Sequence, residues 1–335
     1  MADAVPNAMP NAVPNAVLDA IVAGYESNQG IRAKRSLRLL EKIFGPSDWL
    51  HGPGDDAAVV PVGTERIVAA GEAIFPPFVA ADPHGAGVAA VVANVSDVAA
   101  MGARPLAIVD TVVGPQQMAE QVLAGMRLAA DTYGIPVVGG HLTVADSGSA
   151  LSAFIVGRVG ANVLSVNEVR PGQALLVAYC MDGAVRADFP FLASLEARGT
   201  RLAGDVALLP TLAEDGACTA AKDISMGGVL GSLAMLLEPT GAGVSLDLGR
   251  LPRPDGVPLE RWVTVFPTYG FLLCVQPHRV ADCLRAFDDR GLACAEAGVV
   301  DDTGRLRVRL DGQEAMLADL ARDGLTRTGA TVRDQ

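Results

Sequence analysis

Lysine and aromatic residues are scarce in this chain, and its 38 acidic residues outnumber its 26 basic ones. Only Lys34, Lys42 and Lys222 are lysines, against 23 arginines, and 4% of the 335 residues are aromatic. The formal net charge is −12. Nonspecific affinity for nucleic acid or for an anionic membrane depends on lysine and arginine, so neither is expected as a partner. Small phosphorylated ligands stay possible if metal ions supply positive charge.

Several familiar signatures are also missing. The five cysteines form no C-x-x-C pair and no cluster with histidine, which argues against a zinc site or a disulfide framework and favours a cytoplasmic protein. Residues 1–16 repeat Pro-Asn-Ala and lack the basic and apolar parts of a signal peptide, so we expect a flexible tail. There is no Walker loop, no G-x-G-x-x-G after a strand and no G-x-S-x-G.

Length and pattern predict two domains that mix strands and helices. A chain of 335 residues is long enough to split into two cores. We expect a tail over 1–16, one domain over 17–165 and a second over 166–335, with the turn RPGQ near the boundary. The apolar stretch 86–103 is predicted as a buried helix, because its central polar residues would be costly in lipid. Helices are predicted at 17–44, 86–101, 116–133, 187–198, 205–221, 229–238 and 278–290, and strands at 57–60, 66–70, 106–113, 174–179, 243–248 and 270–275.

The first motif with chemical content is GPGDDAAVV at 52–60. The glycines, Gly54 among them, allow a tight turn and close approach to a ligand, and Asp55 and Asp56 leave that turn in different directions. One of these carboxylates could hold a metal. Alone, the motif is as well explained by an ordinary turn.

The second motif is ANVSDVAAMGARP at 93–105. Asn94 and Asp97 lie three residues apart, on nearly the same face of the predicted helix. A buried ionised carboxylate needs a cation or hydrogen-bond donors. The local sequence leaves two partners open for Asp97: a metal ion, or a structural ion pair with Arg104.

The third motif is GGH at 139–141, predicted to form a turn after a strand. Ligands commonly bind at the carboxyl ends of strands in α/β sheets. Gly139 and Gly140 could approach a phosphate there, and His141 could contact the phosphate or move a proton. A structural histidine in a loop is the alternative.

The fourth motif is KDISMGG at 222–228, directly before an apolar helix. Ser225 is predicted to cap this helix, and Gly227 and Gly228 would leave backbone N–H groups free for phosphate. Lys222 adds a mobile positive charge and Asp223 a further carboxylate. The same residues could also simply make a well-capped core helix, with Lys222 solvated.

Taken in order, the four motifs resemble those of the aminoimidazole ribonucleotide (AIR) synthase superfamily. That superfamily includes thiamine-monophosphate kinase, selenophosphate synthetase and a hydrogenase-maturation dehydratase, and the resemblance covers about residues 30–310. It implies two α/β domains, with N-terminal strands that form a barrel across a homodimer and a C-terminal mixed sheet backed by helices. It also implies ATP and Mg²⁺ as cofactors.

The resemblance assigns roles to particular residues. It implies a metal-binding set of Asp55, Asp56, Glu72, Asp97 and Asp223, and it places residues 139–141 at the phosphate. Together with the motifs, this gives a candidate ATP and phosphate set of Gly54, Asn94, Gly139, Gly140, Ser225, Gly227 and Gly228, with Lys222 and His141 as candidate catalytic residues.

The departures from the family pattern concern the substrate. Thiamine-monophosphate kinase has a Thr/Ser-Asp pair where this chain has Gly71-Glu72. His141 is more like the selenophosphate branch, but that branch needs a reactive Cys or selenocysteine near the N-terminus, and no Cys precedes Cys180. The hydrogenase-maturation branch needs a C-terminal cysteine, and this chain ends in TVRDQ. The chain looks most like AIR-synthase-related ATP-utilising enzymes whose substrate is unknown.

Two functions follow as hypotheses. The first is a Mg²⁺-dependent enzyme that uses ATP to phosphorylate or activate a small molecule, because metal-bridged phosphates suit an acidic protein. The second is a nucleotide-binding regulatory protein of the same fold, which Gly71-Glu72 favours, and a kinase similar to thiamine-monophosphate kinase is a further alternative.

Overall fold

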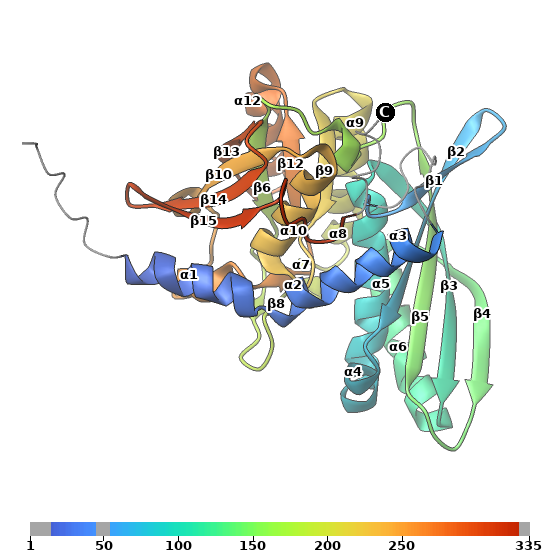
Figure 1. The fold of residues 1–335 in the computed structure, drawn as a ribbon. Coiled ribbons are helices and arrows are strands. Elements are labelled where there is room, and N and C mark those ends of the chain that lie inside the picture. The colour runs from blue at the N-terminus through green and yellow to red at the C-terminus, as the bar shows by residue number, and fades with distance from the viewer. Residues whose placement is uncertain (1–14, 45–53, 328–335) are drawn as a thin grey trace, which may run out of the picture.

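The computed structural model of the protein describes residues 15–44 and 54–327. Two large sheets lie on either side of a layer of helices (Figure 1). One hydrophobic core joins them, because Val91 and Val98 of the central helix α5 (Pro83–Ala100) belong to the same buried cluster as Leu176 and Phe271 of the C-terminal sheet. The mixed α/β architecture predicted from the sequence is confirmed.

The N-terminal sheet has five strands in the order β1-β2-β5-β3-β4. Only the β3·β4 pair is parallel. Helices α5 and α6 (Gln116–Tyr133) pack against each other, and α5 lies on the sheet. Helix α5 begins cleanly because Asp82 accepts a hydrogen bond from the Gly85 amide at 2.8 Å. The strands are β1 (Ala58–Val62), β2 (Glu65–Ile74), β3 (Ala103–Gly114), β4 (Val137–Val144) and β5 (Ala150–Val159).

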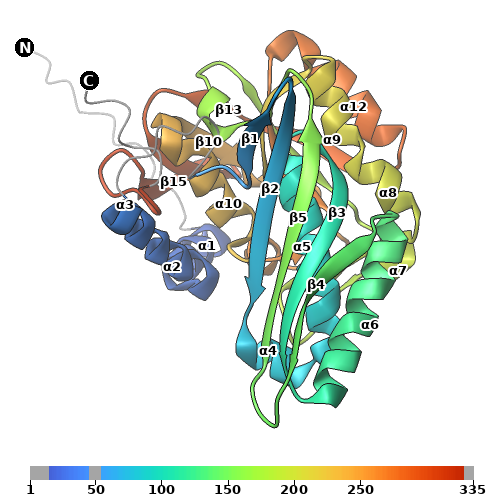
Figure 2. The same ribbon diagram turned by 90° about the vertical axis from the view of Figure 1, so that its right-hand side faces the viewer.

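The other face of the N-terminal sheet is apolar and exposed. It points toward the viewer in Figure 2, with α5 behind it and α6 beside it. Its exposed hydrophobic side chains include Val109, Phe154 and Val156. A patch of this kind on a sheet is typical of a surface that another protein covers.

The C-terminal sheet has seven strands in the order β15-β14-β10-β13-β6-β12-β9. Its strands β6 and β12 are buried along their whole length, as expected for continuous apolar runs at the middle of a sheet. The strands are β6 (Ala174–Tyr179), β9 (Cys218–Asp223), β10 (Gly243–Asp247), β12 (Gly270–Val275), β13 (Ala293–Asp301), β14 (Arg305–Leu310) and β15 (Gln313–Asp319). A small sheet joins β7 (Ala184–Val185), β8 (Phe191–Ala193) and β11 (Phe266–Pro267). The helices of the C-terminal half are α7 (Leu195–Arg198), α8 (Arg201–Val206), α9 (Leu208–Glu214), α10 (Gly228–Leu237), α11 (Leu259–Trp262) and α12 (Val280–Asp288).

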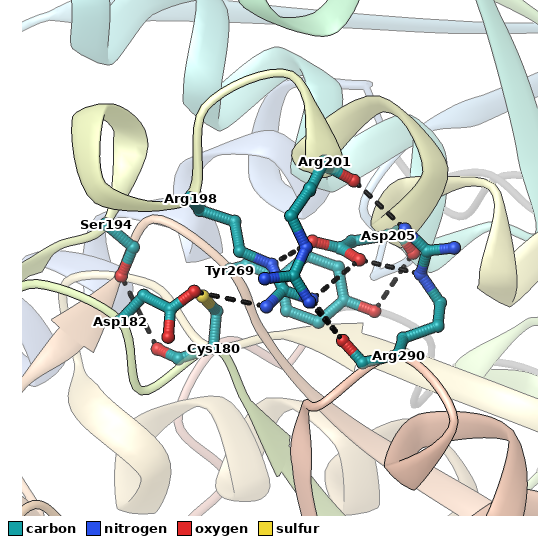
Figure 3. A network of polar contacts seen from close by, with 8 residues as sticks. All are labelled: Cys180, Asp182, Ser194, Arg198, Arg201, Asp205, Tyr269 and Arg290. Carbon is teal, nitrogen blue, oxygen red and sulfur yellow. Dashed lines mark hydrogen bonds and ion pairs between the residues drawn. The ribbon is translucent and has the colours of Figure 1, made fainter.

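An ionic network centred on Asp205 joins helices α7 and α8 to the loop at Asp182 and to Arg290, which follows α12 (Figure 3). Asp205 of α8 accepts two hydrogen bonds from the Arg198 guanidinium, at 2.7 and 3.1 Å, and one from Arg290 at 2.6 Å. Arg198 also contacts Asp182, and Tyr269 donates to the Asp205 carbonyl. Because the Arg198–Asp205 pair is shielded from solvent, removing either partner would leave a buried charge uncompensated.

The helices at the start of the chain pack on the C-terminal half. Helix α1 (Ala16–Ser27) contacts α11, β14 and β15, and α2 (Gln29–Lys34) contacts α10. Helix α3 (Arg38–Phe44) then runs toward the N-terminal sheet (Figure 1). The boundaries expected from the sequence assign residues from 17 onward to the N-terminal domain, whereas α1 and α2 pack on the C-terminal half. The tail predicted over 1–16 lies outside the described residues except for Asn15, which caps α1, and Ala16.

Several predicted elements need correction. The helix predicted at 187–198 is a short strand followed by one turn of helix, and the helix predicted at 205–221 ends before β9. Strands β13 to β15 were not predicted. Within the described part of the chain, no helix combines the length and the apolar character needed to cross a bilayer, in agreement with the buried helix predicted at 86–101.

Candidate metal and phosphate site

Three carboxylates meet where the two halves of the chain adjoin. Asp56 comes from the turn before β1, Asp97 from the last turns of α5, and Asp223 from the end of β9, the edge strand of the C-terminal sheet. One ligand atom from each lies within 4.8 Å of the others. The cluster exists only because both halves contribute to it.

Lys222 is the cation of this cluster. It is only 2% exposed, forms an ion pair with Asp56, and lies 3.3 Å from Asp223 Oδ1. The Asp223 amide also donates to Asp56 Oδ2 at 3.1 Å. The solvated, mobile lysine considered from the sequence is therefore wrong, because β9 carries the side chain into the junction between the halves.

Burial and mutual repulsion disfavour the ionised carboxylates. Burial raises the pKa of Asp56 to about 7, although Lys222 opposes the shift. The pKa of Asp97 is raised well above its usual range, first by burial and then by the charges of Asp223, Asp56 and Glu72. Burial alone would lower the pKa of Lys222, but Asp56 and Asp223 hold it above its ordinary value. The single ammonium group of Lys222 thus offsets only part of the negative charge of the three carboxylates, and a second cation would offset the rest.

The alternative partner for Asp97 is excluded. Arg104 forms an ion pair with Glu214 at 3.0 Å, on the surface. The positive charge that lowers the pKa of Asp97 is that of Lys222.

Asp55 acts differently from its neighbour Asp56. Its Oδ2 accepts from Ser165 Oγ and its Oδ1 from the Val166 amide, both at 2.7 Å. Burial raises its pKa to about 6, against these two hydrogen bonds. Asp55 therefore ties the turn to the segment between the two halves, while Asp56 faces the cluster. Gly54, with φ of 113°, supplies the left-handed conformation that starts this turn.

Glu72 lies on β2 at the margin of the cluster. Burial raises its pKa, opposed by the charge of Lys34 and reinforced by that of Asp223. Lys34, at the end of α2, was not singled out from the sequence, and nothing in its surroundings along the chain would have pointed to it. Asn94 is fully buried and donates to the carbonyls of Ala90 and Ala153, so its amide nitrogen binds backbone.

The motif GGH does not form the predicted turn. Gly139, Gly140 and His141 lie inside strand β4, in register with Val109, Asp110 and Thr111 of β3. Gly140 lies beside the Asp110 carboxylate on the α5 side of the sheet, so His141, the next residue, faces the opposite side. Within one chain, His141 is not brought to the acidic cluster.

The turn after Asp223 also differs from the prediction. The N-cap of α10 is Gly227, without a side-chain cap, and the Ser225 amide donates to Ser232 Oγ at 3.0 Å. Gly228 needs its left-handed φ of 62°, and a methyl group there would overlap the Val263 carbonyl. Helix α2 covers this turn, because Gly30 lies directly against the Met226 carbonyl.

The donor set suits a hard divalent cation. Mg²⁺ binds oxygen ligands at about 2.1 Å, so two opposite ligand atoms are about 4.2 Å apart. The 4.8 Å limit on the atoms of Asp56, Asp97 and Asp223 is close to this spacing. In such sites, water molecules and substrate phosphates commonly occupy the remaining coordination positions of Mg²⁺.

Comparisons with known proteins agree with this architecture. The family described as AIR synthase related protein matches with its N-terminal domain at residues 54–159 and with its C-terminal domain at 194–311. An uncharacterised protein of Synechocystis sp. is 32% identical over 91% of this chain and 97% of its own length. A selenide, water dikinase of Carboxydothermus hydrogenoformans is 29% identical over 69% of this chain and 70% of its own.

Solved structures share the fold. Thermotoga maritima PurL in complex with ATP superposes with a TM-score of 0.73 at 20% identity, over 92% of this chain but only 52% of PurL. AaThiL in complex with AMPPCP and TMP has a TM-score of 0.64 at 20% identity, over 83% of this chain and 94% of its own. The two-domain fold predicted from the four motifs is confirmed, and the chain belongs to the AIR synthase related family.

Proposed function

We propose that this protein is a Mg²⁺-dependent enzyme that uses ATP to phosphorylate or activate a small molecule in the cytoplasm. The observation that carries the proposal is the cluster of Asp56, Asp97 and Asp223, built from both halves of the chain and only partly neutralised by Lys222. Family membership supports ATP as the phosphate donor, since PurL and AaThiL have been solved with ATP or AMPPCP.

The residues take distinct roles in this proposal. Asp56, Asp97 and Asp223 would hold the metal, and Glu72 would add negative charge at the margin of the cluster. Mg²⁺, when bound, neutralises phosphate oxygens and fixes their geometry. Asp55 keeps Asp56 in place through Ser165.

Lys222 is suited to the transferring phosphoryl group. Its ammonium group is already held at the cluster by Asp56 and Asp223, so it needs no reorganisation when charge develops on phosphate oxygens. The Gly227 amide lies at the start of helix α10, whose N-terminus favours an anion, whereas the Gly228 amide already donates to the Ser225 carbonyl at 2.8 Å.

A homodimer accompanies this function. The exposed apolar face of the N-terminal sheet, which includes Val109 and Phe154, would be covered by the same face of a second copy. That arrangement would also place His141 in the interface, on the side of the sheet away from α5.

ATP consumption across a panel of small amides, ribotides and thiamine phosphate tests the proposal. We expect Mg²⁺-dependent turnover with at least one compound, and a loss of at least a hundredfold in Asp97→Asn and Asp223→Asn. Asp131→Asn is the control, because Asp131 is exposed on α6, far along the chain from the cluster, and pairs with Arg127. Turnover that persists with excess chelator would overturn the metal role. Mg²⁺-dependent ATP binding without consumption of any compound would favour the regulatory alternative.

A further inference from the structure

Helix α2 packs closely on the turn between β9 and α10. A methyl group on Gly30 of α2 would overlap the Met226 carbonyl, and a methyl group on Gly231 of α10 would press on Ile31. Ile31 is buried in the same hydrophobic core as α10. These contacts hold α2 at a fixed place beside the turn that follows the acidic cluster.

The same contacts determine where Lys34 lies. It comes three residues after Ile31 and four after Gly30, so the three residues share one face of α2. That face is the one turned toward α10 and its preceding turn. Burial raises the pKa of Glu72, and the strongest charge that acts against this shift is that of Lys34, ahead of that of Lys222. The Lys34 ammonium group is therefore near the margin of the cluster.

Lys34 differs from the other two lysines in being available to a ligand. Lys222 is buried and already paired with carboxylates, and Lys42 is exposed on α3. Lys34 is partly buried, and no residue in the described part of the chain forms an ion pair with it. It is close enough to Glu72 to act on that carboxyl group, yet its N–H donors are left to an acceptor from outside the chain.

The charge of the site indicates which acceptor this is. Glu72 and the three aspartates of the cluster share one buried ammonium group, and a bound Mg²⁺ would still leave part of their negative charge unbalanced. A phosphate chain brings further negative charge to the same place, and the carboxylates repel it. A second ammonium group beside Glu72 would offset this repulsion, because a lysine acts on phosphate oxygens as a compact point charge.

We propose that Lys34 binds a phosphate oxygen of ATP beside the metal site, so that helix α2 contributes to the site together with both halves of the chain. This assignment rests on the proposed function, because it takes ATP as the nucleotide. Lys34 precedes residue 54, where the match to the family begins, so its role follows from the packing of α2 and not from the family match. The N-terminal helices thus take part in nucleotide binding.

Matched variants separate contact with phosphate from a role in the fold. Lys34→Met removes the charge and keeps an unbranched side chain, Lys34→Arg keeps the charge, and Lys42→Met is the control on α3. Gly231→Ala would press on Ile31 and displace α2 without removing a charge, whereas Gly24→Ala adds a methyl group where nothing lies within 4 Å. Without ligand, the thermal midpoint of Lys34→Met should stay within about two degrees of the wild type, since no ion pair is lost.

Calorimetry measures the affinity for ATP, inorganic triphosphate and adenosine, each in the presence of Mg²⁺. We expect Lys34→Met and Gly231→Ala to weaken the binding of both phosphate compounds about tenfold or more, and Lys34→Arg to retain most of the affinity. Lys42→Met and Gly24→Ala should match the wild type, and no variant should change the affinity for adenosine. Gly231→Ala should cost no further affinity when added to Lys34→Met, because α2 then carries no ammonium group to displace.

Equal affinity of Lys34→Met and the wild type for both phosphate compounds overturns the assignment. Unchanged affinity together with a lower thermal midpoint of Lys34→Met without ligand would also overturn it, and would make Lys34 a structural counter-charge of Glu72. Failure of the wild type to bind ATP or triphosphate would overturn the proposed function and this assignment with it, whereas binding that does not depend on Lys34 overturns the assignment alone.

Discussion

Replacing Lys222 by Met tests whether this lysine holds the acidic cluster together in the absence of metal. In the native protein, the Lys222 side chain is nearly inaccessible and contacts the carboxylates of Asp56 and Asp223. Methionine keeps a similar unbranched chain but carries no charge. The variant would therefore leave three neighbouring carboxylates, including Asp97, without a cation.

The size of the effect follows from this burial. Removing one partner of a buried ion pair costs about 3–5 kcal/mol, which is a large part of the roughly 5–15 kcal/mol that stabilises a typical domain. At about 2–4 °C per kcal/mol for a protein of this size, the thermal midpoint should fall by roughly 6–20 °C. Mg²⁺ binds the same carboxylates, so it should restore more stability to the variant than it adds to the wild type.

Thermal unfolding at pH 7, with chelator and then with excess Mg²⁺, gives both numbers. Lys42→Met is the matched control, because Lys42 is exposed at the end of α3, and its midpoint should stay within a degree or two of the wild type. A loss below about 1 kcal/mol in Lys222→Met with chelator would refute the role of the buried pair. Equal stabilisation of variant and wild type by Mg²⁺ would show that metal and lysine do not share ligands.

Four further outcomes are expected. Asp97→Asn should weaken Mg-ATP binding about tenfold or more while its thermal midpoint holds or rises, and a large loss of stability with unchanged ATP affinity in calorimetry would contradict the metal role. Light scattering should give a dimer at micromolar concentration and a monomer for Phe154→Arg, so a wild-type monomer of 34.5 kDa would refute the interface. Arg198→Met should lower the free energy of unfolding in urea by about 3–5 kcal/mol, because Asp205 would lose its main buried partner, and a change below 1 kcal/mol would refute this. Burial raises the pKa of Asp110, so the ionised carboxylate destabilises the folded protein. This destabilisation is absent below the unfolded pKa of about 3.9 and grows as pH rises through the folded pKa. The stability of Asp110→Asn relative to the wild type should therefore increase between about pH 3 and 7, and a constant difference across that range would contradict this.

The acidic motifs could be predicted from the sequence because each has a local signature. The turn that carries Asp56 and the carboxylate of Asp97 within an apolar helix are both visible in short windows, and the structure brings these residues together with Asp223. What such windows cannot show is which neighbour compensates a buried charge. Arg104 was as close along the chain as any cation, yet the sheet order places Lys222 there instead.

The predicted boundaries of strands and turns were wrong for a related reason. Two glycines at 139–140 indicate a turn in isolation, but parallel pairing with β3 extends β4 through them and leaves Gly140 beside Asp110. Ser225 has the composition of an N-cap, yet its amide binds Ser232, and the backbone of Gly227 starts the helix.

The central claim is that Mg²⁺ links ATP to the carboxylates of both halves, and calorimetric titration of ATP tests it most directly. The titration is run on the wild type, Asp97→Asn, Asp223→Asn and the exposed control Asp131→Asn, with Mg²⁺ and with excess chelator. We expect the wild type and Asp131→Asn to bind ATP about tenfold or more tightly with Mg²⁺ than with chelator, and we expect Asp97→Asn and Asp223→Asn to lose most of this difference. Equal ATP affinity of the wild type with and without Mg²⁺ would contradict the claim.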